Sequence, residues 1–162
     1  MTSISSDHTQ KGERKEMLKK AIIFMAGAAL VLSLTGLGMA QDMNPKVKAM
    51  LDAARADIKT VKAEAVKSAL DSKEKAIFLD VRDGGEFAAG HLPGALNISR
   101  GTLEFQVFGK IPDQNAKIYV YCKTKARSAM ATKTLNDLGY KNAVLMDAPY
   151  EEWVKAGYPV ER

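Results

Sequence analysis

Cys122 is the only cysteine in this chain of 162 residues. It follows a strand-like apolar run at 118–121 and precedes a helix-like segment that begins near Arg127. At such a junction, the amides of the loop and of the next helix N-terminus favour negative charge. Lys123, Lys125 and Arg127 add positive charge nearby. These features favour the thiolate over the thiol, and the thiolate is the nucleophilic form of cysteine.

The loop that begins at Cys122 is also suited to holding an anion beside the sulfur or attached to it. Arg127 could donate two hydrogen bonds to an oxyanion. Four residues separate Cys122 from Arg127, whereas cysteine phosphatases carry one residue more in the comparable loop. The shorter loop suits a smaller group, such as one extra sulfur atom on the cysteine. The alternative for a lone cysteine is a buried small hydrophobe, but its place at a strand end favours a reactive thiol.

The elements that position Cys122 are predicted to alternate along the chain. Strand-like segments are expected at 58–61, 76–81, 95–98, 117–122 and 143–146, and helices at 44–56, 62–70, 86–89, 101–111, 127–140 and 150–157. This alternation predicts an α/β domain with a mainly parallel central sheet flanked by helices. Ligands bind such sheets at the carboxyl ends of the strands, which is where Cys122 is expected.

Four stretches, taken in order, give the sequence a specific resemblance. They are "FLDVRDGGEFAAGHLPGALNI" at 78–98, "YCKTKARSAMA" at 121–131, "LGYKNAVLM" at 138–146 and "WVKAGYPV" at 153–160. Together they resemble the single-domain rhodaneses, a family of sulfurtransferases. The resemblance covers roughly residues 58–162 and implies the rhodanese-like three-layer fold. The predicted helix at 44–56 lies outside it, as an extra N-terminal helix.

The resemblance implies a sulfur transfer through a persulfide on Cys122, with no cofactor. The donor would be a small anion such as thiosulfate, and the acceptor cyanide, a thiol or a protein. The resemblance places the substrate within the active loop, formed by Lys123, Thr124, Lys125, Ala126 and Arg127. Two alternatives stay open: a persulfide-carrying or sulfide-sensing module with little turnover, and a cysteine phosphatase or arsenate reductase. The short loop argues against the second.

The chain departs from the family pattern at two places. Lys125 stands where the family loop commonly has glycine, a residue that accepts positive φ in tight anion-binding turns. We expect Lys125 to strain this turn or to trade close approach for charge. The segment 147–153, "DAPYEEW", stands where the family usually has a Gly-Gly pair, so the loop beside the site is expected to differ.

Other polar residues in the signature are expected to be structural. In rhodaneses, the acid that matches Asp80 lies near the active loop, and the arginine that matches Arg82 commonly pairs with the glutamate that matches Glu86. His91 lies in a Gly-His-Leu-Pro-Gly turn, where its ring is expected to satisfy backbone groups rather than act as a base. Trp153 and Tyr158 are expected in the core or at its edge. The two histidines and one cysteine of the chain do not form a plausible metal site.

The N-terminal segment has the three-part form of a secretory signal peptide. Lys19 and Lys20 precede residues 21–40, which hold no charge and end in Gly-Met-Ala, so cleavage is expected before Gln41. The alternative is an uncleaved membrane anchor. A complete signal could also begin at Met17, which leaves the true start open.

The chain is thus predicted to contain a signal peptide at 1–40, a helical extension at 41–57 and a rhodanese domain at 58–162. Its location would be periplasmic or secreted, with membrane contact only through an uncleaved signal segment. The net charge of +5 is mild for this length and does not favour nucleic acid as a partner.

Overall fold

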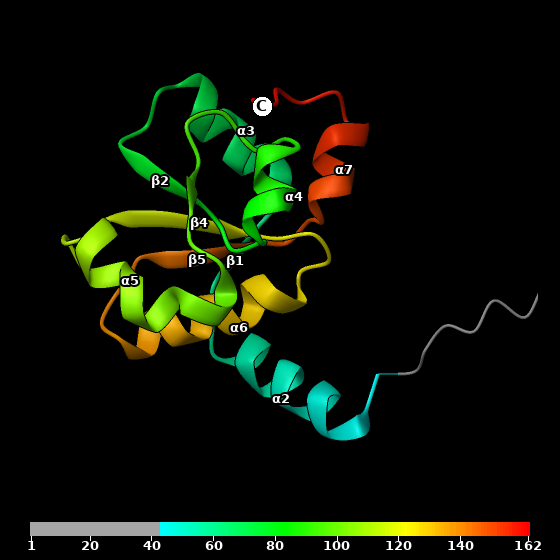
Figure 1. Ribbon diagram of the computed structural model, residues 1–162, viewed down its shortest axis with the longest axis vertical. Helices are drawn as coiled ribbons and strands as arrows, with labels where there is room; N and C mark the ends of the chain where they lie inside the picture. The colour runs from blue at the N-terminus through cyan, green and yellow to red at the C-terminus, as the bar shows by residue number, and fades with distance from the viewer. Residues whose placement is uncertain (1–42) are drawn as a thin grey trace, which may run out of the picture. The chain divides into compact units, whose positions relative to one another are not determined.

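The computed structural model describes residues 43–162, which form an α/β domain around a five-stranded parallel sheet (Figure 1). The strand order is β1-β5-β4-β2-β3, and every neighbouring pair is parallel. The predicted fold class is therefore confirmed. The strands are β1 (Thr60–Val61), β2 (Ala76–Asp80), β3 (Leu96–Asn97), β4 (Lys117–Tyr121) and β5 (Ala143–Met146).

Helices join successive strands, as parallel pairing requires. Two of them begin earlier than expected, since α4 starts at Gly84 and α6 at Ala126. The helical elements are α2 (Pro45–Ala56), α3 (Ala63–Asp71), α4 (Gly84–Ala88), the 3₁₀ turn η1 (Arg100–Thr102), α5 (Leu103–Lys110), α6 (Ala126–Asp137) and α7 (Tyr150–Lys155).

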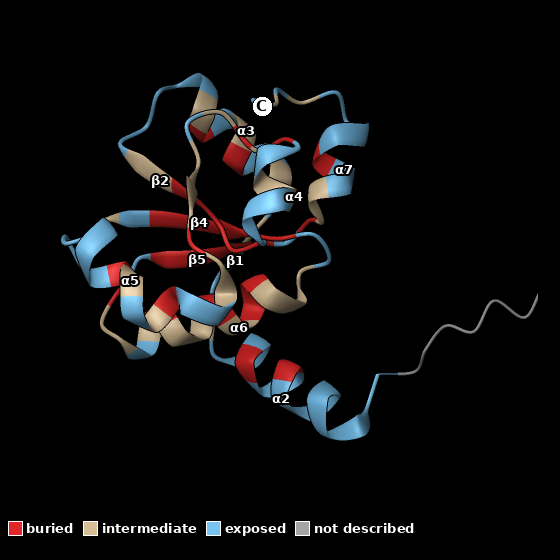
Figure 2. Ribbon diagram, in the orientation of Figure 1, coloured by how far each residue is buried: buried red, intermediate tan, exposed pale blue. Residues whose placement is uncertain are grey.

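The central strands are buried on both faces, which explains their unbroken apolar sequences (Figure 2). Successive side chains of a strand point to opposite faces. In β4, Ile118 and Val120 enter a core completed by α5 and α6, whereas Tyr119 and Tyr121 enter a second core completed by α3 and α7. The domain therefore has three layers, and β4, the central strand of the middle layer, leads directly into Cys122.

The predicted N-terminal helix is present as α2. Asn44 caps it by accepting a hydrogen bond from the Lys46 amide at 2.9 Å, and Pro45 occupies its first turn. Leu51 and Ala54 are buried, and α2 packs against α6 (Figure 1). This packing joins the helical extension to the helix that follows the active loop.

The predicted signal segment at 1–40 lies outside the residues that the structure describes, so its cleavage stays a prediction. Between residues 43 and 162, no helix combines the length and apolarity needed to cross a bilayer.

Candidate active site

Cys122 lies directly after β4, at the carboxyl end of the sheet. It is 1% exposed, and its neighbour strands are β2 and β5. The Cys122 carbonyl accepts a hydrogen bond from the Tyr150 amide at 3.1 Å, which anchors the start of α7 to the loop. The backbone at Cys122 is thus held between the sheet on one side and α7 on the other.

The sulfur of Cys122 contacts a polar residue that the sequence reasoning missed. The amide of Ser128 donates to Sγ at 3.3 Å, and the thiol donates to Ser128 Oγ at 3.2 Å. Ser128 Oγ in turn donates to the Lys125 carbonyl at 3.3 Å. Ser128 is fully buried. The sulfur therefore sits in a buried site in which the Ser128 amide donates a hydrogen bond to it.

Ser128 owes this position to the start of α6. The first amides of a helix have no partner within the helix, so they are free to donate to groups in front of it. Ser128 is in the first turn of α6, one residue beyond the predicted donor range 123–127. The free amides expected at the start of this helix were the signal that could have pointed to Ser128.

Lys125 adopts the left-handed conformation that glycine usually supplies. Its φ is 74° and its ψ is −12°, at the residue that precedes α6. For a residue with a Cβ, this conformation costs about 1–2 kcal/mol. The expected strain is thus present. The Lys125 carbonyl accepts the Ala129 amide at 3.0 Å, so the strained residue also starts the hydrogen bonding of α6.

Arg127 forms a two-pronged ion pair with Glu86. Nη1 donates to Oε2 at 2.6 Å and Nη2 to Oε1 at 2.9 Å, and Asp83 lies 3.4 Å from Nη1. Glu86 is held on the first turn of α4, where it accepts the Asp83 amide at 3.3 Å. The hydrogen bond from Arg127 lowers the pKa of Glu86, and the same bond raises the pKa of Arg127.

The pairing of Arg82 with Glu86, which the resemblance implied, is wrong for this chain. Arg82 Nη2 instead donates to Asp80 at 2.6 Å and to the Gly90 carbonyl at 2.7 Å. Asp80 ends β2 and is fully buried, so it needs the nearest cation, and Arg82 is two residues away. Burial alone would lower the pKa of Arg82, but the hydrogen bond and charge of Asp80 outweigh it and raise the pKa. Asp80 and Arg82 form scaffold, as expected.

The two lysines of the loop each face a carboxylate from the segment 147–153. Lys125 Nζ lies 3.1 Å from Asp147, and Lys123 Nζ lies 3.7 Å from Glu151. Both departures from the family pattern therefore meet in space, although they are far apart in sequence. Thr124 is exposed and Ala126 is half-buried at the start of α6. The roles of 123–127 in substrate binding stay a prediction.

His91 and Trp153 have the structural surroundings expected for them. His91 Nδ1 lies 3.0 Å from the Phe87 carbonyl, and the ring stacks on Phe87 with centroids 3.7 Å apart. Trp153 is fully buried and donates from Nε1 to the Pro159 carbonyl at 2.9 Å. Tyr158 packs edge-on against Trp153. Within residues 43–162, no group of three or more His, Cys, Asp or Glu side chains is arranged to hold a metal.

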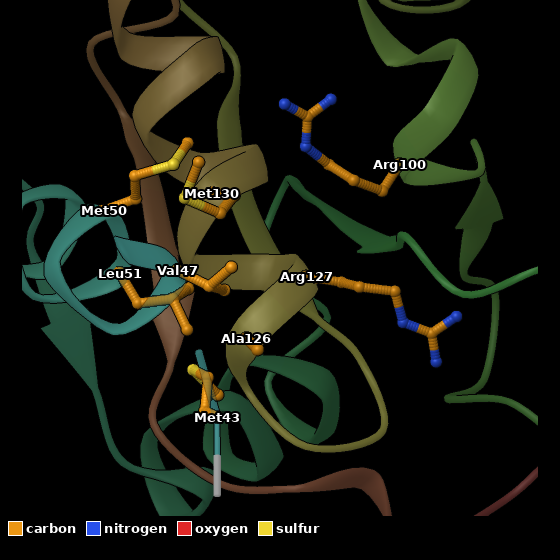
Figure 3. Close-up of a pocket in the computed structure, with 8 residues that line it drawn as sticks. All are labelled: Met43, Val47, Met50, Leu51, Arg100, Ala126, Arg127 and Met130. Carbon is orange, nitrogen blue, oxygen red and sulfur yellow. The ribbon is translucent and has the colours of Figure 1, made fainter. Parts of the chain in front are cut away.

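An apolar cavity of about 440 Å³ lies between α2 and α6, next to the end of the active loop. Figure 3 shows its apolar side chains gathered together, with the Arg100 and Arg127 side chains extending away from them. Arg100 is engaged with Glu104 at 2.8 Å, and Arg127 with Glu86. The remaining lining residues are Met43, Val47, Met50, Leu51, Ala126 and Met130.

Comparisons with known proteins agree with this geometry. The rhodanese-like domain family matches residues 62–156. Over 92 residues the chain is 33% identical to the thiosulfate sulfurtransferase GlpE of Pseudomonas putida, covering 57% of this chain and 81% of GlpE. Over 96 residues it is 31% identical to the putative sulfur carrier protein YrkF of Bacillus subtilis, covering 59% of this chain. The chain spans about half the length of YrkF (51%) and 26% of two further relatives.

The fold also matches a solved structure from Rhodopseudomonas palustris, described as a protein of unknown function and possible tyrosine phosphatase. The TM-score is 0.68 at 31% sequence identity, with 76% of this chain and all of the other covered. That coverage extends beyond the 95 residues matched by the family.

Proposed function

Because this chain belongs to the rhodanese-like domain family, we propose that it is an exported sulfurtransferase that works through a persulfide on Cys122. The observation that carries the proposal is the position of the sulfur. Sγ lies at the carboxyl end of the central strand and accepts the amide of Ser128 at 3.3 Å. A thiolate at Sγ gains stabilisation from such a fixed donor in a buried site.

The proposed reaction has two steps. In the first, the Cys122 thiolate attacks the outer sulfur of the donor, and the S–S bond of the donor breaks. With thiosulfate, sulfite leaves with the electron pair and Cys122 carries the persulfide. In the second, a nucleophilic acceptor attacks the outer sulfur and Cys122 leaves as thiolate. Cyanide gives thiocyanate, and a thiolate gives a persulfide. Such a sequence shows ping-pong kinetics.

The donor and acceptor are proposed from the relatives and from the loop. The name of GlpE describes a thiosulfate sulfurtransferase, so thiosulfate is the first donor to test, with cyanide or a thiol as acceptor. A protein acceptor is a further possibility that the name of YrkF, a putative sulfur carrier, brings forward. The signal-like segment before Gln41 supports the proposed periplasmic or secreted location.

A second candidate function is a persulfide carrier with little turnover. The observation that favours it is burial, since Cys122 is 1% exposed under a loop strained at Lys125. A donor and an acceptor must each reach this sulfur in every cycle, whereas a carrier is loaded once and then docks. A steady-state assay with thiosulfate and cyanide separates the sulfurtransferase from the carrier, because a carrier shows one turnover and then stops.

The experiment that tests the proposal is mass spectrometry of the full-length protein after incubation with thiosulfate. We expect an added mass of about 32 Da, one sulfur atom, on Cys122, removed by cyanide. Cys122→Ser is expected to lose both the adduct and turnover. Turnover that survives in Cys122→Ser would refute the mechanism. Hydrolysis of an aryl phosphate without any sulfur adduct would instead favour the phosphatase reading suggested by the description of the Rhodopseudomonas protein.

A further inference from the structure

Every cation of the active loop is paired with a carboxylate from outside the loop. Arg127 is held by α4, and the two lysines are held by the segment that follows β5. We call the three carboxylates the acidic collar; its members are Glu86, Asp147 and Glu151. With Asp83 beside Arg127, the four nearby carboxylates outnumber the three loop cations.

The closest pair on the lysine side of this collar joins Lys125 and Asp147. Lys125 and Asp147 lie 3.1 Å apart, and they occur at the two places where the chain departs from the family pattern. Side chains of Lys125 and Asp147 are 33% and 53% exposed, so the pair stands at the water-facing rim of the site. Lys123 and Glu151 form a looser and more exposed pair at 3.7 Å.

Paired charges at the rim change which donors the site attracts. A free cation draws an anionic substrate into a cleft, but a carboxylate a few ångströms away cancels most of that attraction. Thiosulfate is a dianion whose sulfonate oxygens need cationic partners, and it must compete with Asp147 and Glu151 for the lysines. An organic persulfide carries at most one charge at its sulfur and has no sulfonate to place.

We propose that Asp147 and Glu151 are specificity-determining residues, which make the site favour organic persulfides over thiosulfate as sulfur donors. This rests on the proposed transfer through Cys122. With a persulfide R–S–SH, the Cys122 thiolate attacks the outer sulfur and the S–S bond breaks. R–S⁻ leaves with the electron pair, and the outer sulfur keeps its proton as Cys122–S–SH. No oxidant or reductant is consumed.

The test compares loading of Cys122 by thiosulfate and by 2-hydroxyethyl persulfide, whose only ionisable group is the persulfide, in the full-length protein. Loading is followed by quenched mass spectrometry without any acceptor, so that the first step is measured alone. The variants are Asp147→Asn, Glu151→Gln and the two combined. At separations of about 6–10 Å in 0.15 M salt, removing two carboxylates near a dianion raises its loading rate about two- to tenfold.

We expect this gain for thiosulfate to come from a lower half-saturating concentration, with the maximum rate unchanged, and to shrink as salt is added. Loading by 2-hydroxyethyl persulfide, which reacts as neutral R–S–SH, should change by less than twofold. Asp137→Asn is the matched control. It removes a carboxylate paired with Lys133 at 2.6 Å, at the far end of α6 and about 16 Å along the helix from Ala126. It should leave both donors unaffected.

The outcomes separate this inference from the proposed function. An unchanged thiosulfate rate in the double variant would overturn the inference, as would an equal gain with both donors. A gain of the same size in Asp137→Asn would overturn it too, since it would reflect net charge alone. If neither donor loads Cys122 in any of these proteins, the proposed function fails, and the inference with it.

Discussion

Lys125→Gly should be more stable than Lys125→Ala, because the backbone at this position has a φ of 74°. Both substitutions remove the ion pair with Asp147, so that loss cancels in the comparison. They differ in the Cβ, which the left-handed conformation disfavours. The comparison therefore isolates the backbone strain at the start of α6.

The size of the effect follows from two opposing contributions. Removing the Cβ relieves about 1–2 kcal/mol of left-handed strain. Glycine also gives the unfolded chain more conformational freedom than alanine does, which lowers the free energy of unfolding by about 0.5–1 kcal/mol. The free energy of unfolding of Lys125→Gly should thus exceed that of Lys125→Ala by about 0.5–1 kcal/mol. For the 120 residues described, that corresponds to about 2–4 °C in Tm.

The neighbouring Lys123 supplies the matched control, since its φ is not positive. There the order should reverse, with Lys123→Ala more stable than Lys123→Gly by about 0.5–1 kcal/mol. Urea unfolding of the four variants, followed by circular dichroism, measures all the differences. The reasoning is refuted if alanine equals or exceeds glycine at position 125, or if both positions show the same order.

Two further predictions concern the sulfur and the ion pair beside it. Ser128→Ala keeps the amide that donates to Sγ but removes the hydroxyl 3.2 Å away. The maximum rate of Cys122 loading should fall about tenfold, for a loss of about 1–2 kcal/mol of transition-state stabilisation. Loading at the unchanged rate would show that the hydroxyl plays no part. The pKa of Glu86 is lowered by Arg127, so the pair stabilises the fold above the ordinary value of 4.5 and loses that contribution as the pH falls below it. In urea unfolding at pH 7, Glu86→Gln should therefore have a free energy of unfolding roughly 0.5–1 kcal/mol below that of the unchanged protein. The two free energies should converge near pH 3, and a difference that persists in acid would contradict the ion-pair explanation.

Elements with a strong apolar pattern were predictable from the sequence. The runs at 76–81 and 117–122 are short and continuous, which is typical of strands covered on both faces, and both form buried strands. The junction at Cys122 followed from them, because chain order alone places a residue at the end of a strand. Strain at Lys125 was one of two outcomes expected from the glycine that the family commonly has there, and its φ of 74° shows the left-handed backbone.

Side-chain partners were less predictable. Arg82 had three acidic residues within four positions, and the resemblance pointed to Glu86, whereas the buried Asp80 holds it. Ser128 was missed because the expected donors ended at Arg127, whereas the amide of the next residue meets the sulfur. Successive residues of a helix point about 100° apart, so which of the first residues faces the sulfur depends on how α6 is placed in the fold.

Periodicity and chain order thus sufficed for the strands, the helices and the place of the nucleophile, because these depend on residues close together in the sequence. The pairing of Lys125 with Asp147 and of Arg127 with Glu86 needed the folded domain. Carboxylates are numerous in this chain, and any of them could neutralise a cation. Which one does so depends on how α4, α6 and the segment after β5 converge at the carboxyl edge of the sheet, and that arrangement is set by packing between segments far apart in the sequence.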